Sequence, residues 1–289
     1  MSFCELIMNC ELLFIYWNPD TVICNLGPLT IRWYSTCWLV GLLLSYFTVK
    51  YLYKKLNLPD EKFEPLFLYC FIGILIGARL GHCLFYEPDY FLSSEKHVVE
   101  MLLPIRYGFD GEWHFTGYEG LASHGGTIGI ILALLLYSHN LKVKMWTVLD
   151  TISISVPITA CFIRLGNLMN SEIIGKPTDV PWAFIFERVD MLPRHPGQLY
   201  EAIAYFCFFF VLWYFWRKKP QLVGTSFFFG LDILLIFTFR FFIEYTKEVQ
   251  EAFEQNMIFD MGQILSIPFI VMGAYFTIRG WRKFTVHSS

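Results

Sequence analysis

The fold is decided by one stretch in the middle of the chain, Thr151-Ile-Ser-Ile-Ser-Val-Pro-Ile-Thr-Ala-Cys-Phe-Ile-Arg-Leu-Gly-Asn-Leu-Met-Asn-Ser-Glu172. No charged residue occurs between Thr151 and Ile163, so Arg164 stands at the edge of an apolar span. An arginine near the centre of a bilayer costs at least ~2.5 kcal/mol, and such residues are usually functional. Polar side chains follow it at Asn167, Asn170 and Glu172. The stretch therefore predicts a membrane helix that ends in a polar site for an anionic lipid.

The composition indicates that the whole chain is built for a membrane. Of its 289 residues, 55% are hydrophobic and 16% are charged, whereas soluble domains carry about 25% charged residues. Aromatic residues are also abundant, with 30 Phe, 16 Tyr and 9 Trp. We therefore expect an all-α integral membrane protein, and the sequence carries no nucleic-acid signature.

Seven apolar segments are each about long enough to cross the ~30 Å hydrocarbon layer at ~1.5 Å rise per residue. They are Trp33–Val49, Phe63–Phe85, Leu121–Tyr137, Trp146–Ile163, Tyr200–Trp216, Gly224–Glu244 and Met261–Ile278. Before the first span, loose alternation around Leu26-Gly-Pro28 predicts a short hairpin at the membrane face. The start, Met1 to Tyr16, lacks the basic residues of a signal peptide and is expected to remain as an interfacial segment.

The distribution of basic residues predicts the orientation of these spans. Twelve of the 22 Lys and Arg lie in short loops on one side: Lys50, Lys54, Lys55, Lys62, Lys142, Lys144, Arg217, Lys218, Lys219, Arg279, Arg282 and Lys283. Short basic loops stay in the cytoplasm, so the N-terminus is predicted outside and the C-terminus inside. The longer loops, including 87–120 and 164–199, then form a small cap on the outer side. We expect a single membrane domain over residues 1–289, with 1–32 as its interfacial N-terminal segment.

Three arginines fall within the outer half or edge of predicted spans, namely Arg79, Arg164 and Arg240. Taken singly, each is well explained by reaching to the interface or by a structural ion pair. Three at one level instead favour an anion site, because the planar guanidinium donates two parallel hydrogen bonds to phosphate. Glycines four residues apart, Gly73, Gly77 and Gly81 in one span and Gly125 and Gly129 in the next, favour close helix packing.

Two histidines are candidates for chemistry. His124, in Ser123-His-Gly-Gly-Thr-Ile-Gly129, is expected at a helix start, where backbone amides favour an anion and a neutral imidazole. A capping histidine with packing glycines explains the same pattern equally well. His195 is held between prolines in Pro193-Arg-His-Pro196, and a hydrogen-bonded structural role remains open for it.

The later spans contribute further polar groups at the same outer level. The polar segment at Arg194-His195 continues into the fifth span with Gln198, Tyr200 and Glu201. These side chains either bind the substrate or hydrogen-bond one helix to another. In Arg240-Phe-Phe-Ile-Glu244 the i, i+4 spacing places both charges on one face, so Glu244 either neutralises Arg240 or directs it at a ligand. The last span opens with Met261-Gly-Gln-Ile-Leu-Ser266.

The eight cysteines form no CxxC pair and have no His partner at zinc spacing, so no metal site is predicted. The sequence indicates no organic cofactor either.

The ordered set of motifs resembles one family, the prolipoprotein diacylglyceryl transferases. The resemblance covers nearly the whole chain and is carried by His124-Gly-Gly126, Arg164 to Glu172, Arg194 to Glu201, Arg240 to Glu244 and Met261 to Ser266, with Leu26-Gly-Pro28 and Arg32-Trp-Tyr34 before them. It implies a bacterial inner-membrane enzyme with its active site toward the periplasm. Such an enzyme moves the diacylglyceryl group of phosphatidylglycerol onto the lipobox cysteine of preprolipoproteins, as the first step of lipoprotein maturation. The products are a thioether and glycerol phosphate.

The resemblance also implies roles for individual residues. His124, Arg164, Asn167, Glu172, Arg240 and Glu244 correspond to essential positions, with Tyr34 in support. A thiol must lose its proton before it displaces a phosphate, and we assign His124 as the base and Arg164 and Arg240 as the phosphate ligands. Substrate binding is assigned to Tyr34, Asn167, Glu172, Arg194, His195, Gln198, Tyr200, Glu244 and Gln263. Two departures from the family pattern stand at Ile236, where a tyrosine is expected, and at Lys247, where an arginine is common.

Two other classes of function compete with this hypothesis. Transporters and lipid flippases also carry arginines and polar residues inside membrane spans. Against a transporter, the chain shows no pair of related halves, and its polar groups gather at one face. A membrane scaffold without catalytic activity leaves the clustered arginines unexplained.

Overall fold

The computed structural model describes residues 14–27, 29–103, 105–108, 111–115, 120–248 and 259–288. The first part of the expected interfacial segment, residues 1–13, lies outside the described residues. The chain divides into two compact units, Met1–Val49 with Leu149–Ser289, and Lys50–Val148, and each is described by itself.

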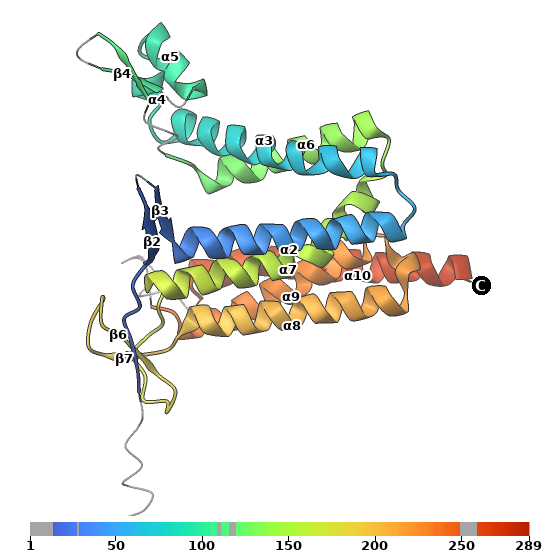
Figure 1. Cartoon of the computed structure of the whole chain (residues 1–289). Coiled ribbons are helices and arrows are strands. Elements are labelled where there is room, and N and C mark those ends of the chain that lie inside the picture. The colour runs from blue at the N-terminus through green and yellow to red at the C-terminus, as the bar shows by residue number, and fades with distance from the viewer. Residues whose placement is uncertain are drawn as a thin grey trace, which may run out of the picture. The chain divides into compact units, whose positions relative to one another are not determined.

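The first unit is a bundle of long helices that run side by side (Figure 1). It contains most of α2 and α7, and all of α8, α9 and α10. Their bounds are Trp33–Lys55, Met145–Asn170, Gly197–Lys218, Phe227–Ile243 and Met261–Ser288. Glycines let two pairs approach closely: a Cβ on Gly41 of α2 would lie 3.2 Å from the Thr159 Cα of α7, and one on Gly230 of α9 would lie 2.4 Å from a backbone nitrogen of α10.

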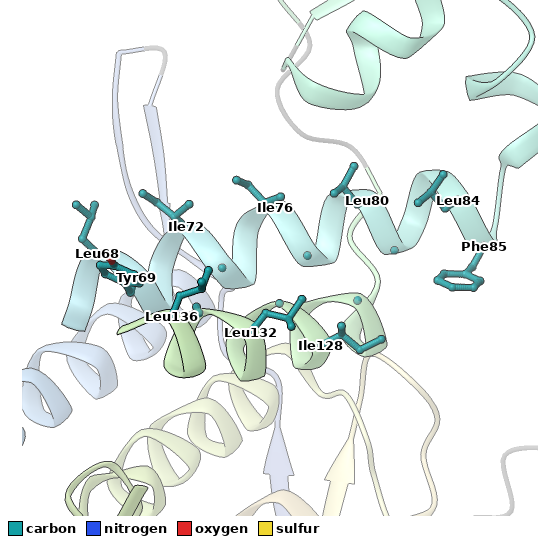
Figure 2. Close-up of a pocket in the computed structure, with 16 residues that line it drawn as sticks. Leu68, Tyr69, Ile72, Ile76, Leu80, Leu84, Phe85, Ile128, Leu132 and Leu136 are labelled. Carbon is teal, nitrogen blue, oxygen red and sulfur yellow. The ribbon is translucent and has the colours of Figure 1, made fainter. Parts of the chain in front are cut away.

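The second unit is built on α3, Asp60–Phe85, and α6, Ser123–Leu141, which lie side by side. The predicted glycine packing is confirmed here, because a Cβ on Gly77 would lie 2.4 Å from the carbonyl oxygen of Gly125. Along the same pair runs an apolar groove of about 490 Å³, with leucine and isoleucine side chains of both helices along its walls (Figure 2). Glycine thus brings the two backbones together and leaves the longer side chains to face outward.

Five helices are long and apolar enough to cross a membrane among the described residues: α2, α3, α7, α8 and α10. The structure is therefore mostly helical, as predicted for an integral membrane protein. At the other two predicted spans it has α6, of 19 residues, and α9, of 17 residues. Neither is among those five, so that seven crossings and their orientation stay predictions.

The difference in helix bounds that bears on the candidate site occurs at α7. The sequence predicted that the span would end at Ile163, but the helix continues to Asn170. Arg164 and Asn167 are three residues apart, and the Arg164 Nη1 donates to the Asn167 Oδ1 at 3.4 Å. Polar side chains on one helix face bond to one another here, which keeps the last two turns helical.

Short strands cover the polar end of the first unit. The predicted hairpin is confirmed as β2, Val22–Leu26, paired antiparallel with β3, Leu29–Arg32, and Gly27 takes a φ of +62° at its turn. A second sheet joins β1, Ile15–Trp17, to β6, Phe184–Phe186, in parallel, and β6 to β7, Pro193–Arg194, in antiparallel. Trp17 ties this sheet to the end of α7, since its indole Nε1 donates to the Leu168 carbonyl at 2.8 Å.

A buried carboxylate fixes the other end of α9. Asp150, on α7, is fully buried and accepts from the backbone N–H groups of Gly224 at 2.8 Å, Ser226 at 3.0 Å and Phe229 at 2.9 Å. These groups lie at the start of α9, where a helix leaves its first amides without partners. Asp150 therefore caps α9 from a neighbouring helix.

In the second unit, Arg79 takes a structural role. Its Nη2 donates to the Glu100 carbonyl at 2.9 Å, and its guanidinium lies over the Phe91 ring. Glu100 lies on α5, Glu95–Leu102, and Phe91 on α4, Pro88–Phe91. The Glu100 carboxylate in turn accepts from the Tyr90 hydroxyl and from the amide of Tyr107, which belongs to β4, Ile105–Tyr107, the partner of β5, Trp113–Phe115. Arg79 thus orders the segment that follows α3 in its own unit, which is the structural role that the sequence left open for it.

Candidate functional site

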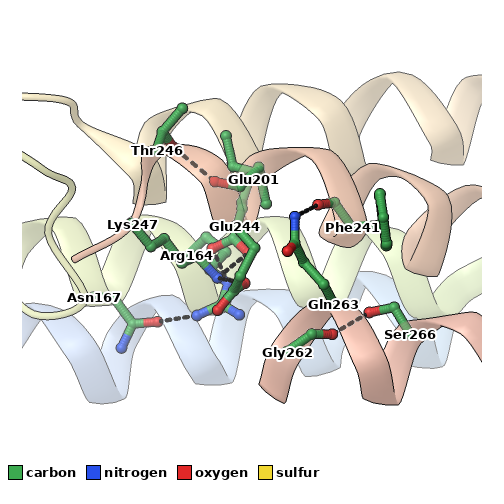
Figure 3. Close-up of polar contacts among 11 residues, drawn as sticks. Arg164, Asn167, Glu201, Phe241, Glu244, Thr246, Lys247, Gly262, Gln263 and Ser266 are labelled. Atoms are coloured by element: carbon green, nitrogen blue, oxygen red, sulfur yellow. Dashed lines mark hydrogen bonds and ion pairs between the residues drawn. The ribbon is translucent and has the colours of Figure 1, made fainter. Parts of the chain in front are cut away.

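The site of the first unit is centred on Arg164, near the end of α7. Its Nε lies 2.8 Å from the Oε2 of Glu201 on α8, and the Glu201 side chain is completely buried (Figure 3). The Arg164 side chain retains 19% of its exposure. A buried carboxylate of this kind must be paired, so the ion pair fixes the guanidinium beside α8.

A strained turn after α7 positions Asn167 and Glu172. Asn167 is buried, and its Nδ2 donates to the Glu172 Oε2 at 3.0 Å, while Asn170 donates to the other carboxylate oxygen at 3.0 Å. The residues on either side of Glu172 have positive φ, +57° at Ser171 and +59° at Ile173. Such backbone strain outside glycine is concentrated at functional sites. Two amides therefore hold the Glu172 carboxylate in one orientation.

Lys247 links two carboxylates of the site. It lies directly after the 3₁₀ turn η2, Glu244–Thr246, and is 7% exposed. Its Nζ is 3.2 Å from the Glu201 Oε1 and 3.2 Å from the Glu244 Oε2. The prediction that Glu244 would hold Arg240 is therefore wrong in this structure, because the carboxylate turns to Lys247.

The side chain of Arg240, in the last turn of α9, has neither a carboxylate nor a hydrogen-bond partner among the described residues. Its guanidinium and that of Arg164 both lie close enough to the phenol of the buried Tyr205 for their charges to act on it. Arg164 and Arg240 therefore share one neighbourhood. The cluster brings together two guanidiniums, and that of Arg240 is half-buried with no carboxylate partner in the part of the chain that the structure describes.

The first turn of α10 closes the site from another side. Gln263 is almost fully buried, and its Nε2 donates to the Phe241 carbonyl at 3.1 Å. Its Oε1 accepts from the Asp260 amide at 3.2 Å. Gln263 thus joins the start of α10 to the end of α9, and Figure 3 shows its bond to Phe241.

Tyr34 reaches the site through α2. A Cβ on Gly166 of α7 would lie 3.0 Å from the Cδ2 of the Tyr34 ring. Gly166 lies between Arg164 and Asn167 in sequence, so the half-buried ring packs against the helix that carries both. The absence of a side chain at position 166 creates the space for this aromatic ring.

Arg194 is surrounded by partners within the loop that follows α7. Its Nε and Nη2 donate to the Asp190 carboxylate, and its Nη1 donates to Glu248 at 3.0 Å and to the Gly175 carbonyl at 3.2 Å. These bonds hold the pKa of Asp190 below its usual range and raise that of Arg194. Its contacts are those of a residue that orders the loop, so a role in substrate binding stays a prediction.

His195, Gln198 and Tyr200 form a hydrogen-bonded corner at the start of α8. The Tyr200 hydroxyl accepts from the Trp182 indole at 2.8 Å and lies 3.2 Å from the His195 Nδ1. The Tyr200 oxygen can accept from two donors, so the His195 tautomer decides which atom of this contact donates. Burial lowers the pKa of His195, which agrees with a neutral ring. The fully buried Gln198 donates to the Glu172 carbonyl and so ties this corner to the strained turn.

His124 lies in the other unit, as the second residue of α6. It is exposed, and the two glycines after it are buried. This confirms the predicted helix start. Its role as a base stays a prediction.

Sequence reasoning missed several members of the cluster. Glu201 was read as the end of a motif, Lys247 as a departure from a pattern, and Tyr205 and Gly262 were not singled out. The sequence marks Glu201 as a charge inside an apolar span and Gly262 as a small residue at the start of one. A single sequence does not show which helix faces meet, so their partners could not be predicted. No group of His, Cys, Asp and Glu with the arrangement of a metal site occurs among the described residues.

Comparison with known proteins places the chain among close relatives. The family model described as "Prolipoprotein diacylglyceryl transferase" matches residues 21–279. The chain is similar to proteins named phosphatidylglycerol–prolipoprotein diacylglyceryl transferase from bacteria, among them those of three species. That of Bacteroides fragilis is 56% identical and the match covers 93% of this chain and 96% of the relative. That of Tolumonas auensis is 43% identical with 90% and 95% covered, and that of Porphyromonas gingivalis is 39% identical with 92% and 94% covered.

Proposed function

Because the chain belongs to the prolipoprotein diacylglyceryl transferase family, we propose that it transfers the diacylglyceryl group of phosphatidylglycerol to the lipobox cysteine of preprolipoproteins. The enzyme is a transferase of lipoprotein biosynthesis. The sulfur of the cysteine forms a bond to the terminal glycerol carbon of the diacylglyceryl group. The bond from that carbon to the phosphate oxygen breaks, and glycerol phosphate leaves with the electron pair.

One observation supports this assignment most directly, namely the half-buried guanidinium of Arg240 without a carboxylate partner among the described residues. A cation in this setting attracts an anion, and a phosphodiester satisfies the fork of donors that arginine presents. Arg164 stands in the same neighbourhood, held by Glu201 at 2.8 Å. The two guanidiniums bind the phosphate before reaction and stabilise the charge that develops on the leaving glycerol phosphate.

The thiol of the acceptor must become a thiolate, because a free cysteine has a pKa of about 8.5 and the thiolate is the nucleophile. His124 is the proposed base, since it is an exposed imidazole at a helix N-terminus. It accepts the thiol proton as the sulfur attacks. The proton then passes to solvent, and the base is restored.

The remaining polar residues bind or position the lipid in this proposal. Asn167 and Glu172 orient the glycerol headgroup, and Tyr34 packs beside them against α7. Gln198 and Gln263 fix the backbone at the two edges of the site, and Glu244 belongs to the cluster through Lys247. Arg194, His195 and Tyr200 order the outer loop against which the substrates rest.

The proposed setting is the inner membrane of a bacterium. Seven helices cross the bilayer with the N-terminus outside and the C-terminus in the cytoplasm, and the two units form one membrane domain. The active site then opens toward the periplasm, where phosphatidylglycerol and the lipobox of a preprolipoprotein meet it. Basic residues in the short loops support this orientation.

The test is a transfer assay on the purified full chain. The protein is incubated with phosphatidylglycerol and a lipobox peptide, and thioether-linked product is measured by mass spectrometry. We expect product from the wild type, and His124→Ala is expected to abolish transfer while lipid binding persists. Movement of lipid between leaflets without any product would favour a transporter instead. Near-normal transfer by His124→Ala would place the base elsewhere.

A further inference from the structure

We propose that Lys247 is a positioning residue that keeps the Glu244 carboxylate away from Arg240, and so keeps the Arg240 guanidinium open to the anionic lipid. The proposal rests on the proposed function, since it concerns the same phosphate site. It assigns a role to a residue whose identity departs from the family pattern.

Arg240 and Glu244 would pair by default. They are four residues apart at the end of α9, and opposite charges at this spacing meet on one helix face. A pair of this kind would neutralise Arg240 and compete with a bound phosphate. The structure shows no such pair, because Glu244 lies 3.2 Å from the Nζ of Lys247 instead.

The backbone explains why Lys247 captures the carboxylate. At Glu244 the α-helix tightens into the 3₁₀ turn η2, and the Lys247 amide donates to the Glu244 carbonyl at 3.0 Å. In a 3₁₀ turn the side chains at i and i+3 are eclipsed, so Glu244 and Lys247 point the same way. A second carboxylate, the buried Glu201, holds the same Nζ at 3.2 Å and fixes the lysine in place.

A glycine on α10 provides the space that Glu244 occupies. A Cβ on Gly262 would lie 2.7 Å from the Cδ and 2.7 Å from the Oε1 of Glu244. Any side chain at position 262 would therefore displace the carboxylate from its present site. Lys247 and Gly262, on different elements, act on Glu244 in the same direction.

The experiment measures equilibrium binding of short-chain phosphatidylglycerol to the detergent-solubilised full chain. In Lys247→Met the freed Glu244 turns to Arg240, and we expect the dissociation constant to rise about tenfold. Gly262→Ala should weaken binding in the same direction. The double variant Lys247→Met, Glu244→Gln lacks the carboxylate that competes with the lipid phosphate for Arg240. Its dissociation constant should therefore return toward the wild-type value. Lys247→Arg keeps the charge and should stay close to the wild type.

Two controls make the result specific. Diacylglycerol with the same chains lacks the phosphate, so its binding should not change in any variant. Lys144→Met removes an exposed lysine charge elsewhere and should leave phosphatidylglycerol binding unaltered. A Lys247→Met variant with wild-type affinity, or a double variant as weak as Lys247→Met alone, would overturn the proposal. A wild type that binds the lipid but forms no thioether would instead contradict the proposed function alone.

Discussion

At the scale of single residues, the sequence predicted which side chains matter better than it predicted their partners. Arg164, Asn167 and Glu172 were expected at one site, and the structure joins them through Asn167. The ion pair from Arg164 to Glu201 was not expected, because Glu201 lies 37 positions later on another helix. The i, i+4 rule predicted Arg240 and Glu244 on one helix face, but it did not anticipate the 3₁₀ turn at Glu244 or the contact of Glu244 with Lys247.

The guanidinium of Arg164 cannot be replaced by a simple ammonium. Arg164→Lys keeps the positive charge but loses the planar fork of N–H donors. In the proposed function this fork contacts Glu201 and the lipid phosphate at the same time. We expect kcat/KM for transfer to fall by at least about tenfold, since one partner of a buried charge pair is disturbed. Initial rates across phosphatidylglycerol concentrations measure this. Arg217→Lys, an exposed position, serves as the matched control, and an equal loss there would contradict the interpretation.

The half-buried His195 should make stability depend on pH. Burial lowers the pKa of His195 in the folded chain, so the unfolded chain binds this proton at a higher pH. The free energy of unfolding should therefore fall as the pH drops below about 6.5, and level off below the folded pKa. His195→Asn keeps an acceptor for Tyr200 and should remove this contribution. Thermal unfolding between pH 5 and pH 8 tests it, and an unchanged slope in the variant would exclude His195 as the source.

At the scale of elements, helices were predictable where apolar runs are long and less so where polar residues share a helix face. The hairpin around Gly27 was anticipated, because Gly-Pro marks a turn. The strands β1, β6 and β7 were not, since each has only two or three residues and β1 pairs with a segment about 170 positions away. The extra turns of α7 carry Asn167 and Asn170, residues that usually indicate a loop.

The pairing of α3 with α6 depends on glycine at specific positions. In Gly77→Ala the new methyl would lie 2.4 Å from the Gly125 carbonyl oxygen, so the helices must separate. Overpacking of this kind costs about 1–3 kcal/mol, and the thermal midpoint in detergent should fall accordingly. Gly126→Ala is the matched control, because the nearest atom to its methyl would be the Ala78 Cβ at 3.5 Å, an ordinary contact distance. Equal midpoints for the two variants would show that the contact does not stabilise the pair.

At the scale of the whole molecule, composition was sufficient to predict a membrane protein, and five helices agree with it. The division into two units was not predictable, because both are equally apolar in sequence. The residues of the candidate site in the first unit come from α2, α7, α8, α9 and α10, so the site depends on helix packing that no local pattern reveals. His124, by contrast, was located correctly at a helix start from its local sequence alone.

The proposed topology places the loop around residue 179 outside the cell membrane and the end of α8 inside. In a background without native cysteines, Asp179→Cys should react with a thiol reagent that does not cross membranes, applied to intact spheroplasts. Lys218→Cys should react only after the membrane is opened. The two positions are both exposed, so the comparison tests location rather than accessibility. Labelling of Lys218→Cys in sealed spheroplasts would reverse the orientation.

The shortness of α9 has a consequence for the surrounding bilayer. Its 17 residues extend roughly 25 Å, which is less than the ~30 Å of hydrocarbon that a typical bilayer presents. Since Asp150 fastens one end of α9 to α7, the helix cannot slide to make up the difference. In the proposed topology α9 crosses the bilayer, and we then expect the lipids beside it to thin to match. We expect the headgroup plane to lie closer to Arg240 there, and the thickness of the host membrane to affect how readily a donor lipid reaches the proposed site.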